Sequence, residues 1–184
     1  MAHRVCPWWL GYWLTSPLRE LFEKPAEILA PYVSEGMTVL EPGPGMGFFT
    51  LELARRVGPR GRVIAVDIQP RMLEGLKRRA RKAGLLDRIE ARLATAESLG
   101  IADVTGSDFA LAFAVVHEIP SPGRFFAEMA RVLKPDATLL FVEPRGHVKD
   151  ALFTQEVQAA IEAGFLEAGR PSIRHSHAAL LARA

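Results

Sequence analysis

The feature that most constrains this chain is a glycine-rich segment that follows a short apolar run. Val39 and Leu40 lead to Glu41, glycines stand at positions 43, 45 and 47, and an apolar pattern at helical spacing then begins. This order is typical of a β-strand that turns tightly into a helix, because glycine adopts backbone angles that other residues resist. The first turn of such a helix presents free N–H groups and a positive dipole end. The segment therefore predicts a cradle for a nucleotide-like ligand, and the alternative is a tight turn that binds nothing.

The spacing of the glycines separates this segment from two common phosphate-binding motifs. A dinucleotide fingerprint, G-x-G-x-x-G, needs a glycine at position 48, where the chain has Phe48. A Walker motif needs Lys followed by Ser or Thr after the glycines, and that pair is absent there. What remains is an acidic residue followed by three glycines at every second position, which disfavours a module for NAD.

The composition predicts a single domain without disulfides. A chain of 184 residues with 49% apolar and 24% charged residues is long enough to bury one core. Its one cysteine, Cys6, excludes a disulfide framework and a cysteine metal cluster, and it fits a reducing compartment. No apolar run reaches the ~18 residues of a membrane span, and Pro7 interrupts the run near the N-terminus, which no cleavage site follows. We therefore expect a cytoplasmic protein with no membrane partner, and its oligomeric state is left open.

Positive charge is concentrated in residues 55–92. This segment holds twelve Lys and Arg against four Asp and Glu, a net charge of +8, whereas the whole chain carries +2. A basic stripe of this kind is typical of a nucleic-acid surface or of a solvated helix face. No aromatic side chains interleave with these charges, as a stacking surface for bases would need, so a solvated face is favoured.

From residue 37 onward, segments of strand character alternate with segments of helical spacing, which is the pattern of a parallel α/β sheet. Strands are expected at 37–41, 62–66, 89–93, 109–116, 138–142, 165–168 and 178–182. Helices are expected at 48–57, from Pro70 to a stop at Gly84, through Phe125 to Leu133, and at 150–163. This predicts one doubly wound domain over residues 37–184. Residues 1–36 are expected to form short helices and an aromatic arm that anchors the domain or covers an apolar pocket, with Trp8, Trp9, Tyr12 and Trp13.

A second acidic residue, Asp67, directly follows the second predicted strand and stands 22 residues beyond Gly45. In open α/β sheets, ligands bind beyond the carboxyl ends of the strands. A carboxylate at that place accepts hydrogen bonds from both hydroxyls of a ribose. The glycine turn and Asp67 together therefore predict a nucleoside site more specifically than either feature alone.

Four segments resemble successive motifs of the class I S-adenosylmethionine-dependent methyltransferases. They are LEPGPGMG (40–47), VIAVD (63–67), FALAF (109–113) and RVLKP (131–135). The resemblance covers about residues 25–183. It implies an α/β fold with a doubly wound, mostly parallel seven-stranded sheet in the order 3-2-1-4-5-7-6, with strand 7 antiparallel and helices on both faces. It also implies S-adenosylmethionine as the cofactor.

The resemblance further implies a role for each matching residue. Glu41 and the glycine turn would hold the methionine part of the cofactor, Asp67 its ribose, and the segment after the third strand its adenine. The implied cofactor-binding residues are Glu41, Gly43, Pro44, Gly45, Gly47, Asp67, Ile68, Thr95, Ala96, Ala114 and Val115, the last two close to the sulfonium. The chain departs from the family where many members have an acid for the adenine amino group. Thr95 stands there instead, and either Thr95 or Glu97 takes that role.

The residues after the fourth and fifth predicted strands are the candidates for catalysis. His117 follows the fourth strand, and Glu143 and His147 follow the fifth, its neighbour in the implied sheet. His117 is the preferred base or orienting group, with Glu143 and His147 second, because a base is needed when the acceptor is protonated. The alternative is that His117 merely hydrogen-bonds the backbone at the end of the strand. The spacing of the three matches no metal-ligand pattern, so no metal is expected.

The expected function is transfer of a methyl group to a small, partly apolar acceptor by direct displacement. No Asn/Asp-Pro-Pro-Tyr/Phe motif follows the fourth strand, which disfavours methylation of the exocyclic amines of bases. Cys6 lies outside the predicted core, which disfavours a cysteine nucleophile. Two alternatives remain: an RNA methyltransferase that uses residues 55–92, and a protein that binds S-adenosylmethionine without turnover.

Overall fold

The computed structural model describes residues 23–184. The expected aromatic arm, with Trp8, Trp9, Tyr12 and Trp13, lies outside the described residues, and the division of the chain at residue 36 stays a prediction. Within the described part, no helix combines the length and the apolar character that crossing a bilayer requires.

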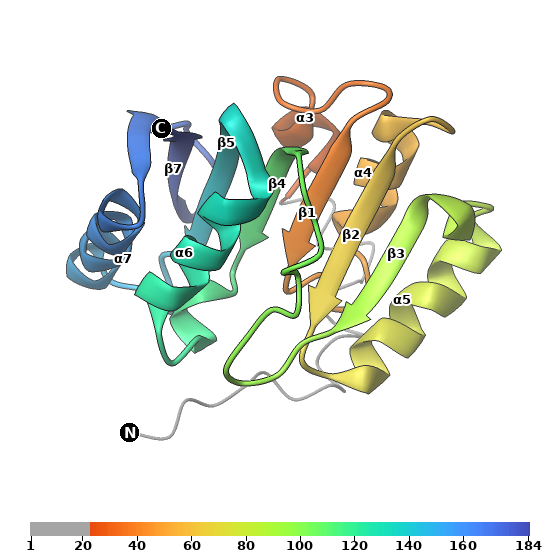
Figure 1. Cartoon of the computed structure of the whole chain (residues 1–184), viewed down its shortest axis with the longest axis horizontal. Helices are drawn as coiled ribbons and strands as arrows, with labels where there is room; N and C mark the ends of the chain where they lie inside the picture. The colour runs from red at the N-terminus through yellow and green to blue at the C-terminus, as the bar shows by residue number, and fades with distance from the viewer. Residues whose placement is uncertain (1–22) are drawn as a thin grey trace.

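One seven-stranded sheet forms the centre of the molecule, in the order β3-β2-β1-β4-β5-β7-β6 (Figure 1). The strands are β1 (Thr38–Pro42), β2 (Arg62–Asp67), β3 (Ile89–Leu93), β4 (Ser107–Phe113), β5 (Leu133–Pro144), β6 (Phe165–Gly169) and β7 (Ser176–Arg183). The first five pair in parallel, and β7 lies antiparallel between β5 and β6. The expected fold class and strand order are confirmed.

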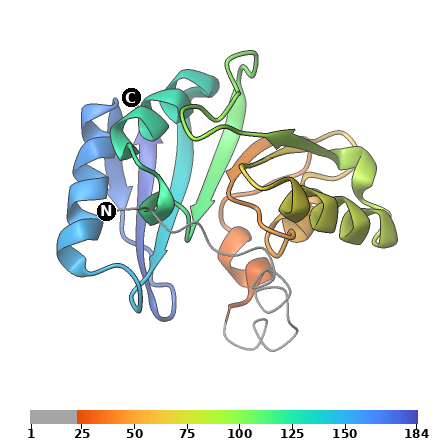
Figure 2. The same ribbon diagram turned by 90° about the horizontal axis from the view of Figure 1, so that it is seen from below.

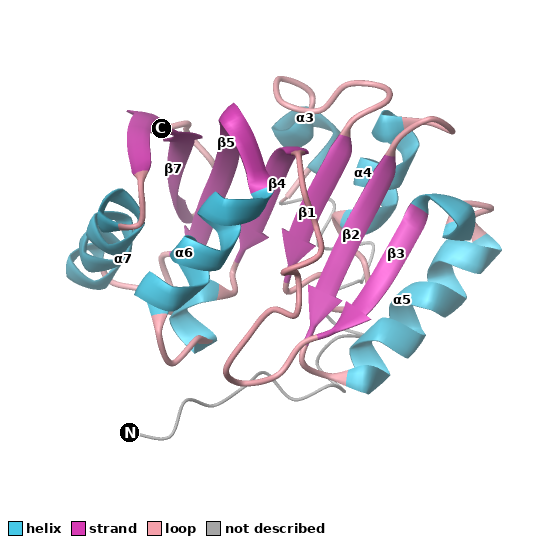
Figure 3. Cartoon of the chain, viewed as in Figure 1, coloured by secondary structure: helices cyan, strands magenta, loops and turns pink. Residues whose placement is uncertain are grey.

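Helices cover both faces of this sheet (Figures 2 and 3). They are α3 (Pro25–Leu29), α4 (Thr50–Val57), α5 (Pro70–Lys82), α6 (Pro122–Val132) and α7 (Asp150–Glu162), with short 3₁₀ helices η1 (Leu86–Arg88) and η2 (Val116–Glu118). Leu40 and Ala110 belong to the core under α6 and α7, whereas Val39 and Phe109 belong to the core under α4 and α5. Because both faces are buried, the central strands read as continuous apolar runs.

Several element boundaries differ from the expected ones; β5, for example, spans Leu133–Pro144 instead of 138–142. Two of the differences border the site. β4 ends at Phe113 instead of position 116, because Ala114 adopts a φ of 55° and the chain turns into η2. The apolar run continues through this turn, where Val116 is fully buried. α4 begins at Thr50 instead of position 48, since the glycine turn extends further than expected. Both differences lengthen the turns that border the site.

We expect Gly61 to tolerate no added methyl group. A Cβ atom at Gly61 would lie 2.6 Å from the backbone oxygens of Met37 and Val57, whereas a Cβ atom at Gly123 would meet nothing within 4 Å. Gly61→Ala should therefore lower the free energy of unfolding by about 2–3 kcal/mol. Gly123→Ala, in the first turn of α6, should leave it unchanged or raise it by up to about 1 kcal/mol. Urea denaturation compares the two variants, and equal effects would contradict this account.

Candidate cofactor and catalytic site

The turn between β1 and α4 is built from three glycines with positive φ: 70° at Gly43, 53° at Gly45 and 86° at Gly47. A Cβ atom at Gly43 would lie 2.5 Å from a methyl carbon of Val115, and one at Gly47 would lie 2.4 Å from a methyl carbon of Leu76. A Cβ atom at Gly45 would meet nothing within 4 Å. Gly45 thus borders open space, and its bare backbone is available to a ligand.

Asp67, at the end of β2, is hydrogen-bonded to this turn. The Gly45 N–H donates to Asp67 Oδ2 at 3.2 Å, and the Gln69 N–H donates to Oδ1 at 2.8 Å. Burial raises the pKa of Asp67 to about 6; these backbone hydrogen bonds oppose the shift, and the charge of Glu118 adds to it. The carboxylate assigned to the ribose is therefore held against the glycine turn.

A cavity of about 580 Å³ opens between the glycine turn, the loop after β3 and the start of α6. Its volume lies within the range of roughly 300–1,000 Å³ that small-molecule sites occupy. Eight of the expected cofactor-binding residues line it: Gly43, Gly45, Asp67, Ile68, Thr95, Ala96, Ala114 and Val115. Glu41, Pro44 and Gly47 are not among the lining residues. The strand-end residues thus share one cavity, and their contacts with the cofactor stay a prediction.

Several lining residues belong to no sequence motif. They come from the start of α5, from η2 and the loop after it, and from α6: Gln69, Met72, Glu118, Ile119, Arg124 and Phe125. Gln69 and Met72 follow Asp67 closely, so the rule that ligands bind beyond strand ends could have found them. Helical periodicity predicts only which face of α6 packs on the sheet. No sequence signal shows that the first turns of α6 border a cavity.

Glu41 is a buried acid next to the turn. It is 4% exposed, and its Oε2 has no hydrogen-bond partner among the described residues. Burial raises the pKa of Glu41 to about 8, and the charge of Asp67 contributes. The neighbouring side chain of Thr50 opposes this shift. A buried carboxyl group with one unpartnered oxygen suits a positively charged ligand group. The residues present therefore fit S-adenosylmethionine. The roles of Glu41 and the turn for its methionine part and of Asp67 for its ribose stay predictions, and Glu41 does not itself line the cavity.

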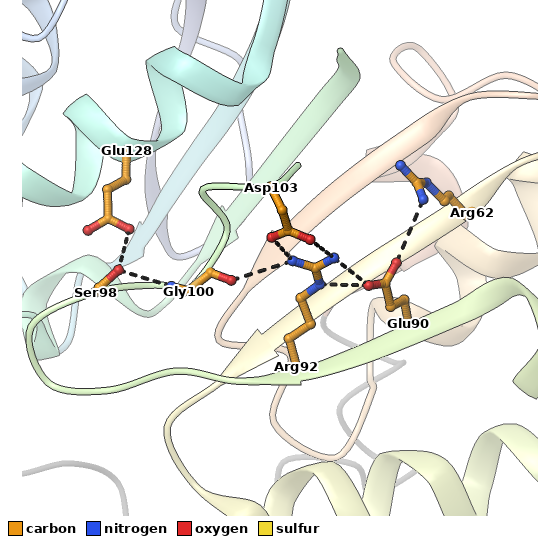
Figure 4. Close-up of polar contacts among 7 residues, drawn as sticks. All are labelled: Arg62, Glu90, Arg92, Ser98, Gly100, Asp103 and Glu128. Carbon is orange, nitrogen blue, oxygen red and sulfur yellow. Dashed lines mark hydrogen bonds and ion pairs between the residues drawn. The ribbon is translucent and has the colours of Figure 1, made fainter. Parts of the chain in front are cut away.

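The loop after β3, residues 94–106, is anchored on two sides (Figure 4). Glu128 of α6 accepts hydrogen bonds from the Ser98 hydroxyl at 3.0 Å and from the Leu99 N–H at 2.9 Å. Arg92 of β3 donates to both carboxylate oxygens of Asp103, at 2.6 and 2.9 Å. The wall of the cavity on the expected adenine side is therefore tied to α6 and to β3.

Thr95, one of the two residues expected to face the adenine, uses its hydroxyl within this loop. Thr95 Oγ1 accepts hydrogen bonds from the N–H groups of Glu97 and Ser98, at 3.3 and 3.1 Å. The hydroxyl thus closes a local turn. Glu97 also lines the cavity, so the choice between Thr95 and Glu97 as the adenine partner stays open to experiment.

His117 and Glu143 form a pair close to the lining residues Val115 and Glu118, but neither of the two lines the cavity, and His147 does not line it either. His117 Nδ1 lies 2.6 Å from Glu143 Oε2, and the N–H groups of Val116 and His117 donate to Oε1 at 2.8 and 3.2 Å. Glu143 is fully buried, so its carboxylate requires Nδ1 as the donor, which leaves Nε2 as the ring nitrogen that can accept a proton; Glu118 Oε1 lies 4.0 Å from Nε2. Burial disfavours the charged imidazole, but the hydrogen bond and charge of Glu143, together with the charges of Glu118 and Glu156, outweigh burial and raise the pKa of His117. The side chain of His117 therefore binds a carboxylate, instead of the backbone partner considered as the alternative.

Two more titratable groups lie close to this pair. The ring centre of His147 is 6.1 Å from that of His117. Glu156 of α7 is 2% exposed, and its Oε2 has no hydrogen-bond partner among residues 23–184. Burial raises the pKa of Glu156 to about 7, and the charge of Glu143 adds to the shift. The structure thus brings the three expected catalytic residues together and adds Glu156, while it shows no group of three metal-ligating side chains in the described range.

A family model described as a methyltransferase domain matches residues 33–170, three quarters of the chain. The chain belongs to the methyltransferase domain family. The match spans the glycine turn, Asp67 and the pair of His117 and Glu143. The family membership and the cavity together give S-adenosylmethionine as the cofactor of this methyltransferase domain.

The relatives of this methyltransferase domain differ widely in length. The ubiquinone/menaquinone biosynthesis C-methyltransferase UbiE of Klebsiella pneumoniae is 34% identical over 111 residues, which are 60% of this chain and 44% of that protein. The chain thus spans less than half the length of that relative. A methyltransferase structure from Aquifex aeolicus has a TM-score of 0.87 at 23% identity and covers 98% of this chain and 100% of its own. TrmN from Thermus thermophilus has a TM-score of 0.70 at 21% identity, covering 87% of this chain and 48% of its own. At these identities, the two structures show a shared fold.

Asp67→Asn should weaken the binding of S-adenosylhomocysteine about 10- to 100-fold. A neutral amide offers one oxygen acceptor, whereas the carboxylate offers two oxygens that share a negative charge. In the wild-type domain, affinity should fall as the pH drops below about 6, because protonation of Asp67 removes the charged acceptor. Isothermal titration calorimetry between pH 5 and pH 8 measures both effects. If the affinity of the wild type and that of Asp67→Asn changed with pH in the same way, Asp67 would be excluded from the binding site.

Glu156 should make the fold less stable as the pH rises. Its pKa of about 7 exceeds the ordinary 4.5, so the folded state keeps a proton that the unfolded chain releases, and stability falls between these values. Glu156→Gln should reduce this fall and raise the melting temperature by about 2–6 °C at pH 8, with little change at pH 4.5. Thermal unfolding at both pH values measures it. Glu162→Gln, at an exposed position of the same helix, is the control. If the melting temperatures of the two variants changed equally between pH 4.5 and pH 8, the prediction would be contradicted.

Proposed function

We propose that this methyltransferase domain transfers a methyl group from S-adenosylmethionine to a small, partly apolar acceptor, with His117 as the general base. The pair of His117 and Glu143 carries the proposal. Glu143 occupies Nδ1 of His117 and leaves Nε2 to take a proton. The neighbouring Val115 and Glu118 line the cavity. His117 itself is not among the lining residues, so we place its Nε2 next to the part of the wall formed by Val115 and Glu118, where the resemblance locates the sulfonium.

The chain's own residues supply positioning and proton transfer. When bound, S-adenosylmethionine supplies a methyl group on a positively charged sulfur, and methyl transfer is a direct displacement that depends mainly on alignment. His117 Nε2 removes the proton of the acceptor, and Glu143 stabilises the imidazolium that results. Because Glu143 also accepts two backbone N–H groups, the base is held in a single orientation.

The walls of the cavity support a partly apolar acceptor. Val115, Ile119 and Phe125 contribute apolar surface, and Glu118 and Arg124 contribute charge. The similarity to a C-methyltransferase of ubiquinone and menaquinone biosynthesis, at 34% identity over 111 residues, agrees with an acceptor of this kind. Among nitrogen, oxygen and carbon nucleophiles, this similarity favours carbon.

The basic segment 55–92 gives little support to the RNA alternative. Much of its charge is used within the fold: Arg62 pairs with Glu90, Arg92 with Asp103, and Arg88 donates to the carbonyl of Ala54. Arginines held in this way are less available to phosphates. RNA binding that weakens steeply with salt would favour the alternative.

His117→Ala should lower turnover about 10²- to 10⁴-fold, the usual contribution of a general base, and should change the affinity for S-adenosylhomocysteine less than about twofold. In the wild type, kcat/KM should rise with pH through the pKa of His117, which is raised above the ordinary 6.5, because only the neutral ring accepts a proton. The release of S-adenosylhomocysteine with a panel of phenols, naphthols and amines measures turnover.

His175→Asn is the matched control for this experiment, because His175 is exposed in the turn between β6 and β7 and asparagine tolerates its φ of 57°. It should retain wild-type turnover. Unchanged turnover in His117→Ala would remove His117 from the mechanism. Binding of S-adenosylmethionine without methylation of any acceptor would favour the alternative of a protein without turnover.

A further inference from the structure

Arg79 belongs to the basic segment 55–92, yet its side chain is hydrogen-bonded to the glycine turn. Arg79 Nη1 donates to the carbonyl oxygen of Met46 at 2.7 Å, across 33 residues of sequence. The same peptide group is held on its other side, because the Gly47 N–H donates to the carbonyl oxygen of Pro44 at 2.9 Å. Two hydrogen bonds thus fix this peptide plane, and the one from Arg79 comes from outside the turn.

The turn has little stiffness of its own at this peptide. Gly47 has a φ of 86°, and a peptide next to glycine rotates at low energetic cost. A stiffer residue does not fit, because a Cβ atom at Gly47 would lie 2.4 Å from a methyl carbon of Leu76. The order of the turn must therefore come from hydrogen bonds and packing, not from the residue type.

One face of α5 provides both a hydrogen bond and close packing to the glycine turn. A Cβ atom at Gly75 would lie 2.8 Å from Met46 Cγ, and Met46 is 3% exposed, so the helix packs closely on the turn. Gly75 and Arg79 are four residues apart, which places them on the same side of the helix. α5 also begins three residues after Asp67. The same helix therefore supports both halves of the candidate nucleoside site.

We propose that Arg79 is a positioning residue for the cofactor, which holds the peptide between Met46 and Gly47 in the orientation that binding requires. The proposal rests on the proposed function, because it takes this turn as the binding site of S-adenosylmethionine. A charged donor makes one of the stronger kinds of hydrogen bond. By fixing the flexible turn before the cofactor arrives, Arg79 reduces the conformational entropy that binding would otherwise remove.

The test compares Arg79→Ala and Arg79→Lys with Arg81→Ala, which removes an exposed arginine from the same helix. Calorimetry with S-adenosylhomocysteine measures affinity, and hydrogen exchange in the free protein measures the order of the amides of residues 45–47. Arg79→Ala should raise the Kd about tenfold and accelerate exchange at these amides, as expected for the loss of a charged hydrogen bond. Arg79→Lys, which keeps a charged donor, should recover affinity to within about threefold of the wild type. Arg81→Ala should match the wild type.

The outcomes separate positioning from packing. A lower melting temperature in Arg79→Ala with unchanged Kd and unchanged exchange would make Arg79 a packing residue and overturn the proposal. If Arg79→Ala does not fold, Arg79→Met, which has no donor, takes its place, and a Kd equal to that of the wild type would overturn the proposal. If the wild-type domain does not bind S-adenosylhomocysteine, the proposed function fails, and the exchange rates alone then decide whether Arg79 orders the turn.

Discussion

The parallel register of β1 and β2 is the constraint on which the site depends. Pro42 pairs with Val66, and the ladder continues into the turn, where the Gly43 N–H donates to the carbonyl oxygen of Val66 at 2.8 Å. The segments that follow β1 and β2 therefore leave the sheet side by side, and the Gly45 N–H reaches the carboxylate of Asp67. A slip of one residue would turn every side chain of β2 to the other face of the sheet. The geometry of the candidate cofactor site thus follows from strand pairing.

Buried carboxyl groups gather at the same edge of the sheet. Glu41, Asp67, Glu143 and Glu156 are all less than 9% exposed. Of these four, only Glu143 forms a salt bridge within the described part of the chain, and its partner is His117. Burial of acids without cationic partners costs stability and is characteristic of functional sites. A positively charged ligand would offset this cost, and for that reason we expect binding of the cofactor to stabilise the fold.

The sequence predicted those parts of the candidate site that lie at strand ends and share one cavity in the structure. The glycine turn, Asp67 and Val115 follow apolar runs, and the topology of an open sheet brings such positions together. The proximity of His117 and Glu143 follows from the same rule, since β4 and β5 are neighbours. Contacts made by helices could not be predicted, because periodicity shows which face of a helix is buried but not what a single side chain reaches. Arg79 and Glu128 are examples: both read as ordinary charges on a helix, and both hold loops of the site.

The sheet separates two cores, and this separation divides the site between two regions that can change independently. The core under α4 and α5 supports the glycine turn, whereas the core under α6 and α7 supports Glu156 and the anchor of the loop after β3. Substitutions on the second side can alter what lies next to His117 without disturbing the turn on the first. A gene encoding such a domain could therefore diverge next to His117 while it keeps the glycine turn. Because Glu128 of α6 anchors the loop on the expected adenine side, directed evolution that keeps the methyl donor would use libraries confined to α7.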